Sequence, residues 1–227
     1  MPCENTTPSI TDRASPRSAD VLTIYGRTNS VNVQKVLWCL EELAVPYTRI
    51  DAGLEHGKNT EPWYLKLNPN GKVPLLTDGS FTLWESNTIV RYLAGKHGLG
   101  SLCPASLEAR ALAERWMDWQ LSTLVSPVSV VFWNLVRKPV GERDAVAIER
   151  NLREANRAMT LLDDHLKHVP YVAGEAFTMG DIPVGATAHR WLEISGIDRP
   201  ALTAVRAWRA RLAERPGFRK HVQLPLS

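Results

Sequence analysis

The sequence predicts an α/β protein in two parts: an N-terminal domain with the element order β-α-β, β-β-α, followed by an all-helical C-terminal domain. Short apolar runs alternate with helical patterns up to about residue 100, whereas only long helical patterns follow Pro104. With 227 residues, of which 44% are hydrophobic, the chain is long enough to form a core in each part. We therefore expect an α/β domain at residues 21–100 and a helical domain at residues 104–227.

The first fifty residues contain the opening elements of the α/β domain. Residues 1–20 are rich in Ser, Thr, Pro and Asn without apolar periodicity, which predicts a flexible extension. The run VLTIY at 21–25 predicts a strand, apolar residues at helical spacing from Val33 to Leu43 predict a helix, and residues 46–50 predict a second strand. A helix between two strands favours a parallel β-α-β unit.

A β-hairpin is predicted at residues 73–84. Two apolar runs flank Asp78 and Gly79, a dipeptide that is typical of a tight I′ turn. Residues 85–97 then carry apolar side chains on one helical face and end before Gly98, a common C-terminal stop. The hairpin and this helix complete the β-β-α half of the domain.

The second part shows helical patterns at residues 107–124, 145–167, 181–195 and 201–214.

Composition excludes several functional classes. The formal charge of +3 comes from basic residues interleaved with acidic ones, so we do not expect nucleic-acid binding. Cys3, Cys39 and Cys103 form neither a CxxC pair nor a zinc-type cluster, so no metal is expected. We identify no apolar run of roughly 20 residues and no signal-peptide core, which predicts a cytoplasmic protein without membrane contact.

Two positions around the hairpin can bind a ligand. Pro74 begins the first hairpin strand, and the residues leave open whether the preceding bond is trans or cis. Glu85 and Ser86 open the following helix, where free N–H groups attract a carboxylate and the Glu85 side chain can accept from an ammonium. First-turn capping explains the same two residues without a ligand.

Several motifs together resemble the cytosolic glutathione S-transferases, most closely bacterial members of the serine type. They are NPNGKVPLL, the DG turn, LWESNTIVRYLA, WMDW in the first helix of the second part, and FTMGDIP at residues 177–183. The resemblance covers almost the whole chain after Asp20. Thr178 and Asp181 resemble the family's N-capping box, in which the hydroxyl accepts from a backbone N–H of the first turn and the carboxylate reaches back towards the threonine. It implies a thioredoxin-like N-terminal domain, glutathione as cosubstrate, a homodimer, and conjugation of small electrophiles in detoxification.

The resemblance also implies a glutathione site. Val73 and a cis Pro74 would hold the cysteinyl backbone, and Glu85 with Ser86 would bind the γ-glutamyl end. Lys72 would lie near the glycyl carboxylate. Two further residues in the segment after the second strand, Asn59 and Lys58, are candidates for that carboxylate and fit a solvated loop equally well.

The thiol needs an activating group, because a cysteine-type thiol with a pKa of about 8.5 is only about 3% thiolate at pH 7. Thr28, Asn29 and Ser30 lie in the turn before the first helix, where hydroxyl and amide donors meet. Ser30 stands where serine-type relatives keep their catalytic hydroxyl, and an ordinary helix cap is the alternative for Ser30 or Asn29. Tyr25 is a second candidate, although it lies inside an apolar run.

The second substrate would lie over the thiol, walled by the first helices of the helical domain. Aromatic residues in that part of the chain are Trp116, Trp119, Phe132 and Trp133, but most tryptophans are expected to be ordinary core, and the sequence does not separate lining from core residues. Arg115 and Arg190 fit either an anionic leaving group or surface ion pairs. Cys39 fits a small core residue rather than a nucleophile. Two other functions stay open, a glutathione-dependent disulfide or peroxide reductase, favoured by Thr28 and Asn29, and a non-catalytic binding module.

Overall fold

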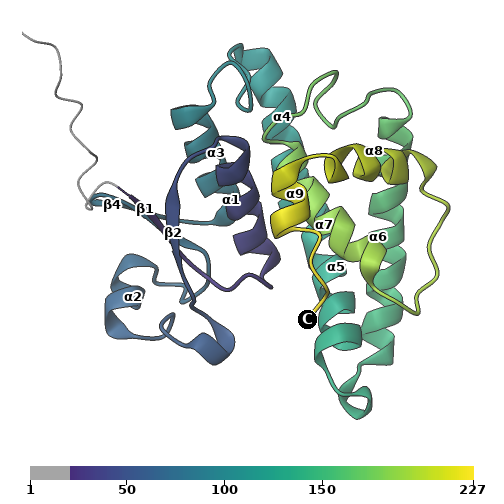
Figure 1. The fold of residues 1–227 in the computed structure, drawn as a ribbon. Coiled ribbons are helices and arrows are strands. Elements are labelled where there is room, and N and C mark those ends of the chain that lie inside the picture. The colour runs from purple at the N-terminus through teal and green to yellow at the C-terminus, as the bar shows by residue number, and fades with distance from the viewer. Residues whose placement is uncertain (1–20) are drawn as a thin grey trace, which may run out of the picture.

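The computed structural model describes residues 21–227, and the extension predicted at residues 1–20 lies outside them. A small sheet with its helices lies beside a larger group of helices, and α1 and α9 are found where the two parts meet (Figure 1). The thioredoxin-like arrangement followed by a helical part, predicted from the sequence, is confirmed.

The sheet has four strands in the order β2-β1-β3-β4. Its strands are β1 (Leu22–Tyr25), β2 (Tyr47–Ile50), β3 (Leu75–Asp78) and β4 (Phe81–Trp84). β1 and β2 pair in parallel, as expected from a crossover helix, and β3 pairs antiparallel with both β1 and β4. Ile24 lies opposite Leu76 in this register, and both are fully buried.

Three helices and a short 3₁₀ turn surround the sheet: α1 (Val31–Glu42), η1 (Leu54–His56), α2 (Pro62–Leu67) and α3 (Ser86–His97). α1 and α3 pack against each other beside the sheet. The sequence did not predict α2, which is only six residues long and has Pro62 at its first position. Proline is tolerated there because the N–H it lacks would have no partner in the helix.

The hairpin turn differs from the prediction by one residue. Asp78 pairs with Phe81, so the two loop residues are Gly79 and Ser80 rather than Asp78 and Gly79. Gly79 has a φ of 59°, while Ser80 is not among the residues with positive φ. Positive φ at the first loop position alone is the pattern of a II′ turn, in which glycine takes that position without a steric cost.

The helical part consists of α4 (Leu107–Trp119), η2 (Gln120–Leu124), α5 (Val125–Phe132), η3 (Trp133–Arg137), η4 (Val140–Glu142), α6 (Ala145–Leu166), α7 (Asp181–Glu193), α8 (Thr203–Ala213) and α9 (Pro216–His221). The helix predicted at 107–124 continues to Arg137 through two π-helical turns, η2 and η3. Pro127 is the third residue of α5 and follows the π-helical turn η2 directly, where the regular hydrogen-bond ladder of the helix is already interrupted.

The run Leu107–Arg137 is also long and apolar enough, by length and composition alone, to cross a membrane. No such run was predicted from the sequence. Here α4 and α5 pack against α7, and α5 packs against α6.

α1 is held from both parts of the molecule. Its Trp38 is fully buried, with ring centroids 5.1 Å from Phe218 and 5.6 Å from Phe177. A Cβ built on Gly217 would lie 2.7 Å from the Trp38 ring, so α9 can approach α1 only because this residue is glycine. The N-terminus of α1 is therefore fixed relative to the helical part.

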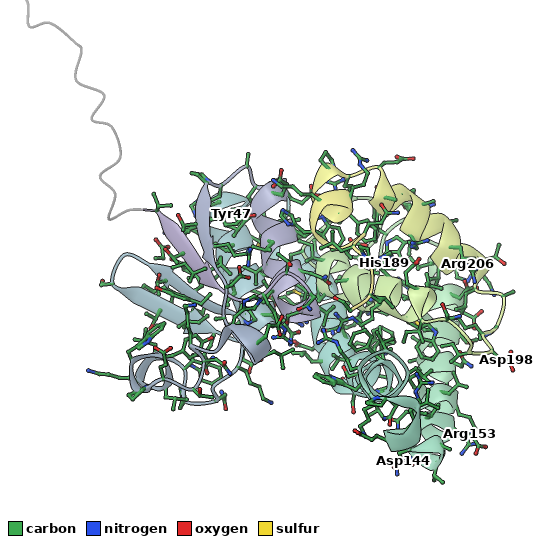
Figure 2. The ribbon with its side chains drawn as sticks, turned by 60° about the horizontal axis from the view of Figure 1, so that its bottom comes forward. Tyr47, Asp144, Arg153, His189, Asp198 and Arg206 are labelled. Atoms are coloured by element: carbon green, nitrogen blue, oxygen red, sulfur yellow. The ribbon has the colours of Figure 1, made fainter. Side chains whose placement is uncertain are left out.

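Two acidic residues begin helices of the second part. Asp144 caps α6 by accepting from the Ala147 N–H at 2.9 Å, at the lower end of that helix in Figure 2. At α7 the Asp181 carboxylate accepts from the Thr178 N–H at 2.9 Å, as the predicted capping box requires. The Thr178 hydroxyl accepts from Gly180 N–H. Burial raises the pKa of Asp181 to about 6.

Candidate functional site

Two adjoining cavities lie at the ends of α1 and α3. The wide cavity, of about 540 Å³, has walls from the N-terminal part and from α5, η3 and α7. The small recess, of about 160 Å³, is formed by the N-terminal part, among residues that include Pro74, Trp84, Glu85 and Ser86. Three residues line both cavities: Asn32, Lys72 and Val73.

The rim between the cavities is a loop fixed by side-chain hydrogen bonds. The Val73–Pro74 bond is cis, as the resemblance implied. The Lys72 carbonyl accepts from the Tyr64 hydroxyl and from Asn68 Nδ2, each at 2.7 Å. Within residues 21–227, the backbone N–H and C=O of Val73 have no hydrogen-bond partner. Its polar backbone is therefore free to bind a ligand.

The small recess is closed by the start of α3. Glu85 precedes the helix with φ 70° and ψ 107°, a conformation that L-residues adopt at a cost of roughly 1–3 kcal/mol. Ser86 is the first helical residue, so its N–H and that of Asn87 have no partner within the helix. A strained carboxylate residue beside two free amides can bind an ammonium and a carboxylate together.

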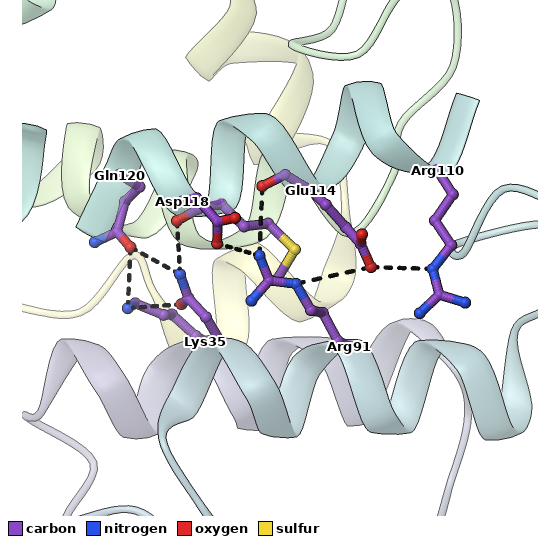
Figure 3. A network of polar contacts seen from close by, with 8 residues as sticks. Lys35, Arg91, Arg110, Glu114, Asp118 and Gln120 are labelled. Atoms are coloured by element: carbon purple, nitrogen blue, oxygen red, sulfur yellow. Dashed lines mark hydrogen bonds and ion pairs between the residues drawn. The ribbon is translucent and has the colours of Figure 1, made fainter. Parts of the chain in front are cut away.

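Lys35 lies directly beneath this recess, and sequence reasoning missed it. Its fully buried ammonium donates to Ser86 Oγ at 3.3 Å, Asn87 Oδ1 at 3.1 Å and Gln120 Oε1 at 3.5 Å; Figure 3 shows Lys35 and Gln120 facing each other across the two parts. Burial lowers the pKa of Lys35 to about 7, and the charge of Glu85 opposes this shift. Ser86 Oγ in turn donates to Asn32 Oδ1 at 3.3 Å.

The turn before α1 brings two of its three candidate residues to the wide cavity. Ser30 is the N-cap of α1 and only 8% exposed, yet its side chain makes no capping hydrogen bond. Asn29 also lines the cavity, and its Nδ2 donates to Ser227 Oγ at 3.3 Å. Thr28 is exposed and lines neither cavity. The Ser30 hydroxyl is thus free to donate into the cavity.

Tyr25 lines neither cavity. Its ring centroid lies 5.4 Å from that of Trp63 and 6.3 Å from that of Tyr64, so it belongs to an aromatic cluster beside β1. Asn59 lines the wide cavity and donates Nδ2 to the Gly71 carbonyl at 2.6 Å, whereas Lys58 does not line it.

The aromatic residues of the helical part fall into two groups. Phe132 and Trp133 line the wide cavity, as predicted. Trp116 and Trp119 do not line it; their ring centroids are 5.1 Å apart, and Trp116 packs 4.6 Å from His165. The sequence left lining and core aromatic residues unsorted, because helical periodicity does not show which buried face borders a cavity.

The two arginines named from the sequence differ in their position relative to the wide cavity. Arg190 lines the wide cavity and is only 9% exposed, so the surface ion-pair interpretation is wrong for it. Arg115 is exposed and lies outside the cavity, with its guanidinium 6.0 Å from the Trp116 ring. Two further arginines of the wide cavity, Arg27 and Arg137, were missed because each stands in a turn or helix end without a local motif.

Cys39 is fully buried in α1, as expected of a core residue. Its Sγ lies 3.9 Å from the Val90 carbonyl, and burial raises the pKa of the thiol well above its usual range. A thiol of that kind is a poor nucleophile.

The chain matches known proteins over both parts. Residues 20–95 match the family model for the glutathione S-transferase N-terminal domain, and residues 145–211 match that for the C-terminal domain. Glutathione S-transferase GstB of Escherichia coli strain K12 is 42% identical over 209 residues, which are 91% of this chain and 100% of the relative. Glutathione S-transferase 3 of Zea mays is 31% identical over 88% of this chain and 93% of its own length.

Among solved structures, the theta class glutathione S-transferase from Xanthomonas axonopodis pv. citri, with glutathione bound, superposes with a TM-score of 0.88 at 45% identity. The match covers 92% of this chain and 100% of that one. Sequence, fold and the paired cavities agree. The chain therefore belongs to the glutathione S-transferase family, as an enzyme that takes glutathione as its cosubstrate.

Proposed function

We propose that this glutathione transferase is of the serine type, with Ser30 donating a hydrogen bond to the glutathione thiolate while the thiolate attacks a small electrophile. The observation that carries the proposal is the Ser30 hydroxyl, which lines the wide cavity at the N-terminus of α1 and makes no capping bond. Thr28 is set aside as thiol activator, because it is exposed and lines neither cavity.

Glutathione spans the two cavities in this proposal. Its α-carboxylate accepts from the free N–H groups at the start of α3, its ammonium pairs with Glu85, and its cysteinyl backbone bonds the free polar groups of Val73. The glycyl carboxylate lies in the wide cavity near Lys72 and Asn59. The thiol then faces Ser30.

Thiol activation has a definite cost. Lowering the thiol pKa from about 8.5 to about 6.5 requires about 2.7 kcal/mol of preferential stabilisation of the anion. A hydrogen bond to a charged group supplies about 1.5–3 kcal/mol, and the amide dipoles at the start of α1 add up to about 1 kcal/mol. Ser30 and the helix N-terminus are together sufficient.

The reaction itself is a substitution or addition. The sulfur forms a bond to the electrophilic carbon, the leaving group departs with its electron pair or the electrons move onto an adjacent acceptor, and the thiol proton is released to solvent. Ser30 keeps its own proton. Catalysis then depends on positioning and anion stabilisation.

Three broader expectations belong to the same proposal: domain limits at residues 21–100 and 104–227, a homodimer, and a cytoplasmic role in detoxification. Support for the dimer comes from exposed apolar side chains on β4 and the α4–η2 run, namely Phe81, Leu112 and Leu121. Light scattering behind a sizing column measures the mass of the assembly directly.

The decisive experiment compares conjugation of 1-chloro-2,4-dinitrobenzene with reduction of hydroxyethyl disulfide, in wild type and Ser30→Ala. We expect conjugation to dominate and its kcat/KM to fall by about 10²–10³-fold in the variant, the usual loss for one donor to a developing anion. Thr28→Ala is the matched control and should keep wild-type activity. Dominant disulfide reduction that survives in Ser30→Ala would instead favour the reductase, with Asn29 as the group to test.

A further inference from the structure

Three arginines from distant segments line the wide cavity. Arg27 precedes α1, Arg137 ends η3, and Arg190 lies on α7. Arg190 packs its guanidinium 4.2 Å from the centroid of the Phe132 ring, and Arg137 lies 5.6 Å from the same centroid. Stacking on this aromatic ring holds both guanidinium groups at the cavity wall contributed by the helical part.

These arginines lack acidic partners in the part of the chain that the structure describes. None of the three forms an ion pair there, and the Nε–H of each is buried without an acceptor. Arg190 donates one side-chain hydrogen bond, from Nη2 to the Asn29 carbonyl at 3.3 Å. Unpaired buried cations are costly, and an anion that enters the cavity removes that cost.

Electrostatics in the cavity point the same way. Burial, together with the charges of Arg137 and Arg27, lowers the pKa of Arg190 to about 10. Glu55 is the acidic residue that opposes these shifts at Arg27 and Arg137, but its side chain is exposed and lies 3.3 Å from His56 Nε2. The guanidinium groups thus keep a surplus of positive charge within the cavity.

Bound glutathione does not use up this charge. Its γ-glutamyl end carries one charge of each sign and belongs to the small recess, which leaves the glycyl carboxylate and the thiolate for the wide cavity. Lys72 and Arg27 belong to the part of the lining contributed by the N-terminal domain, and in the proposed function they pair with those two anions. Arg137 and Arg190 belong to the helical part and stack on Phe132, and Arg190 also donates to the Asn29 carbonyl, so both border the space left for the second substrate.

We propose that the second substrate is an anionic electrophile, with a carboxylate or sulfonate that binds Arg190 and Arg137 and a flat body that packs on Phe132 and Trp133. This rests on the proposed transferase function and names the substrate class of that same site. Arginine suits the role because its planar fork of N–H donors matches a carboxylate in two parallel bonds.

The test uses a matched pair, 4-chloro-3-nitrobenzoate and its neutral methyl ester. In each, the glutathione sulfur forms a bond to the ring carbon that carries chlorine, and chloride leaves with its electron pair. Each kcat/KM is divided by the uncatalysed rate of glutathione thiolate with the same compound, so that ring reactivity cancels. We expect wild type to favour the benzoate by about 10- to 100-fold, the range of a charge-assisted pair.

The variants are Arg190→Gln and Arg137→Gln, with Arg115→Gln as the control outside the cavity. The proposal predicts that in both cavity variants the ratio of benzoate to ester kcat/KM falls towards one, because only the benzoate pairs with the guanidinium groups, whereas Arg115→Gln keeps the wild-type ratio. Arg190→Lys should restore part of the preference. If Arg190→Gln does not fold, Arg137→Gln and competition on wild type by 4-nitrobenzoate against 4-nitrobenzamide give the same information.

The outcomes separate this inference from the proposed function. Wild type that binds glutathione but conjugates neither compound contradicts the transferase mechanism itself. Wild type that conjugates both with equal corrected rates overturns the anionic substrate class alone. Equal loss of both substrates in Arg190→Gln, with a raised Kd for glutathione, would assign the arginine to glutathione and also overturn the inference.

Discussion

The small recess and the wide cavity differ in size, charge and origin. The recess, about 160 Å³, offers one carboxylate residue, Glu85, beside the amide groups that begin α3. The cavity, about 540 Å³, is bounded by both parts of the molecule and carries three arginines that form no ion pair within residues 21–227. The recess suits the γ-glutamyl end, which is the same in every reaction. The cavity suits the glycyl carboxylate of glutathione together with a second substrate that can vary.

This difference indicates that the protein recognises glutathione and the second substrate through different interactions. Paired charges on a rigid helix start select the γ-glutamyl end by geometry. In the cavity, surplus positive charge favours any anion of suitable shape, and it favours the thiolate over the thiol as well. Ser30 stands between these regions, two residues before Asn32, which lines both.

Glu85→Gln is expected to have the largest effect on this comparison. Loss of the charge that pairs with the ammonium should raise the KM for glutathione by about 10- to 100-fold, because a hydrogen bond between charged groups contributes roughly 1.5–3 kcal/mol. The ratio of rates for anionic and neutral electrophiles should stay at its wild-type value. Steady-state kinetics with both substrates varied, beside the exposed control Glu154→Gln, measures this.

A shift in that ratio with glutathione saturating would break the separation of the two regions. It would mean that the recess and the cavity act as one electrostatic unit.

Lys35→Met probes the support beneath the recess through pH. Because burial lowers the pKa of Lys35 from 10.5 to about 7, the unfolded chain holds a proton between those values that the folded chain has released. The free energy of unfolding of wild type should therefore rise with pH in this window, by up to about 1.4 kcal/mol per unit. The variant should lack this contribution.

Urea unfolding at pH 7.5 and 8.5 measures the slope, with exposed Lys66→Met as the control. If the free energy of unfolding changes equally with pH in wild type and Lys35→Met, the Lys35 ammonium keeps its ordinary pKa. The group that bonds Ser86 would then be fully protonated at neutral pH.

Tyr25→Phe should have the smallest effect. The ring packs against Trp63 and Tyr64 outside both cavities, so kcat/KM should stay within about twofold of wild type. If kcat/KM in the same conjugation assay fell as far as in Ser30→Ala, Tyr25 at the end of β1 would be the group that activates the thiol. That result would contradict the geometry described above.

Sequence reasoning reached the recess more completely than the cavity. Lys72, Val73 and Pro74 are contiguous, and Glu85 and Ser86 follow after one hairpin, so local motifs identify all five. Arg27, Arg137 and Arg190 come together only through the packing of α1, the α5–η3 run and α7. Periodicity cannot assign such residues, because helix packing decides which buried side chains border a cavity.

In the fold, too, sequence patterns predicted some elements and missed others. Strands and long helices were predicted from periodicity, whereas the six-residue α2 and the continuation of α4 to Arg137 were not. Both misses involve a proline: Pro62 lies at the first helical position, where its missing N–H has no cost, and Pro127 directly follows the π-helical turn η2, where the regular ladder is already interrupted. The predicted hairpin turn was wrong by one residue, because Asp78 pairs with Phe81 in the strand ladder and the loop consists of Gly79 and Ser80.

The most direct test of the central claim is the pKa of the glutathione thiol bound to the enzyme, measured by the ultraviolet absorbance of the thiolate across a pH titration. Wild type should give a value of about 6.5, and Ser30→Ala a value about one to two units higher, because the variant loses the hydrogen bond and keeps the amide dipoles of α1, with glutathione still bound in both. The same low value in wild type and variant would contradict the assignment of Ser30 as the group that activates the thiol.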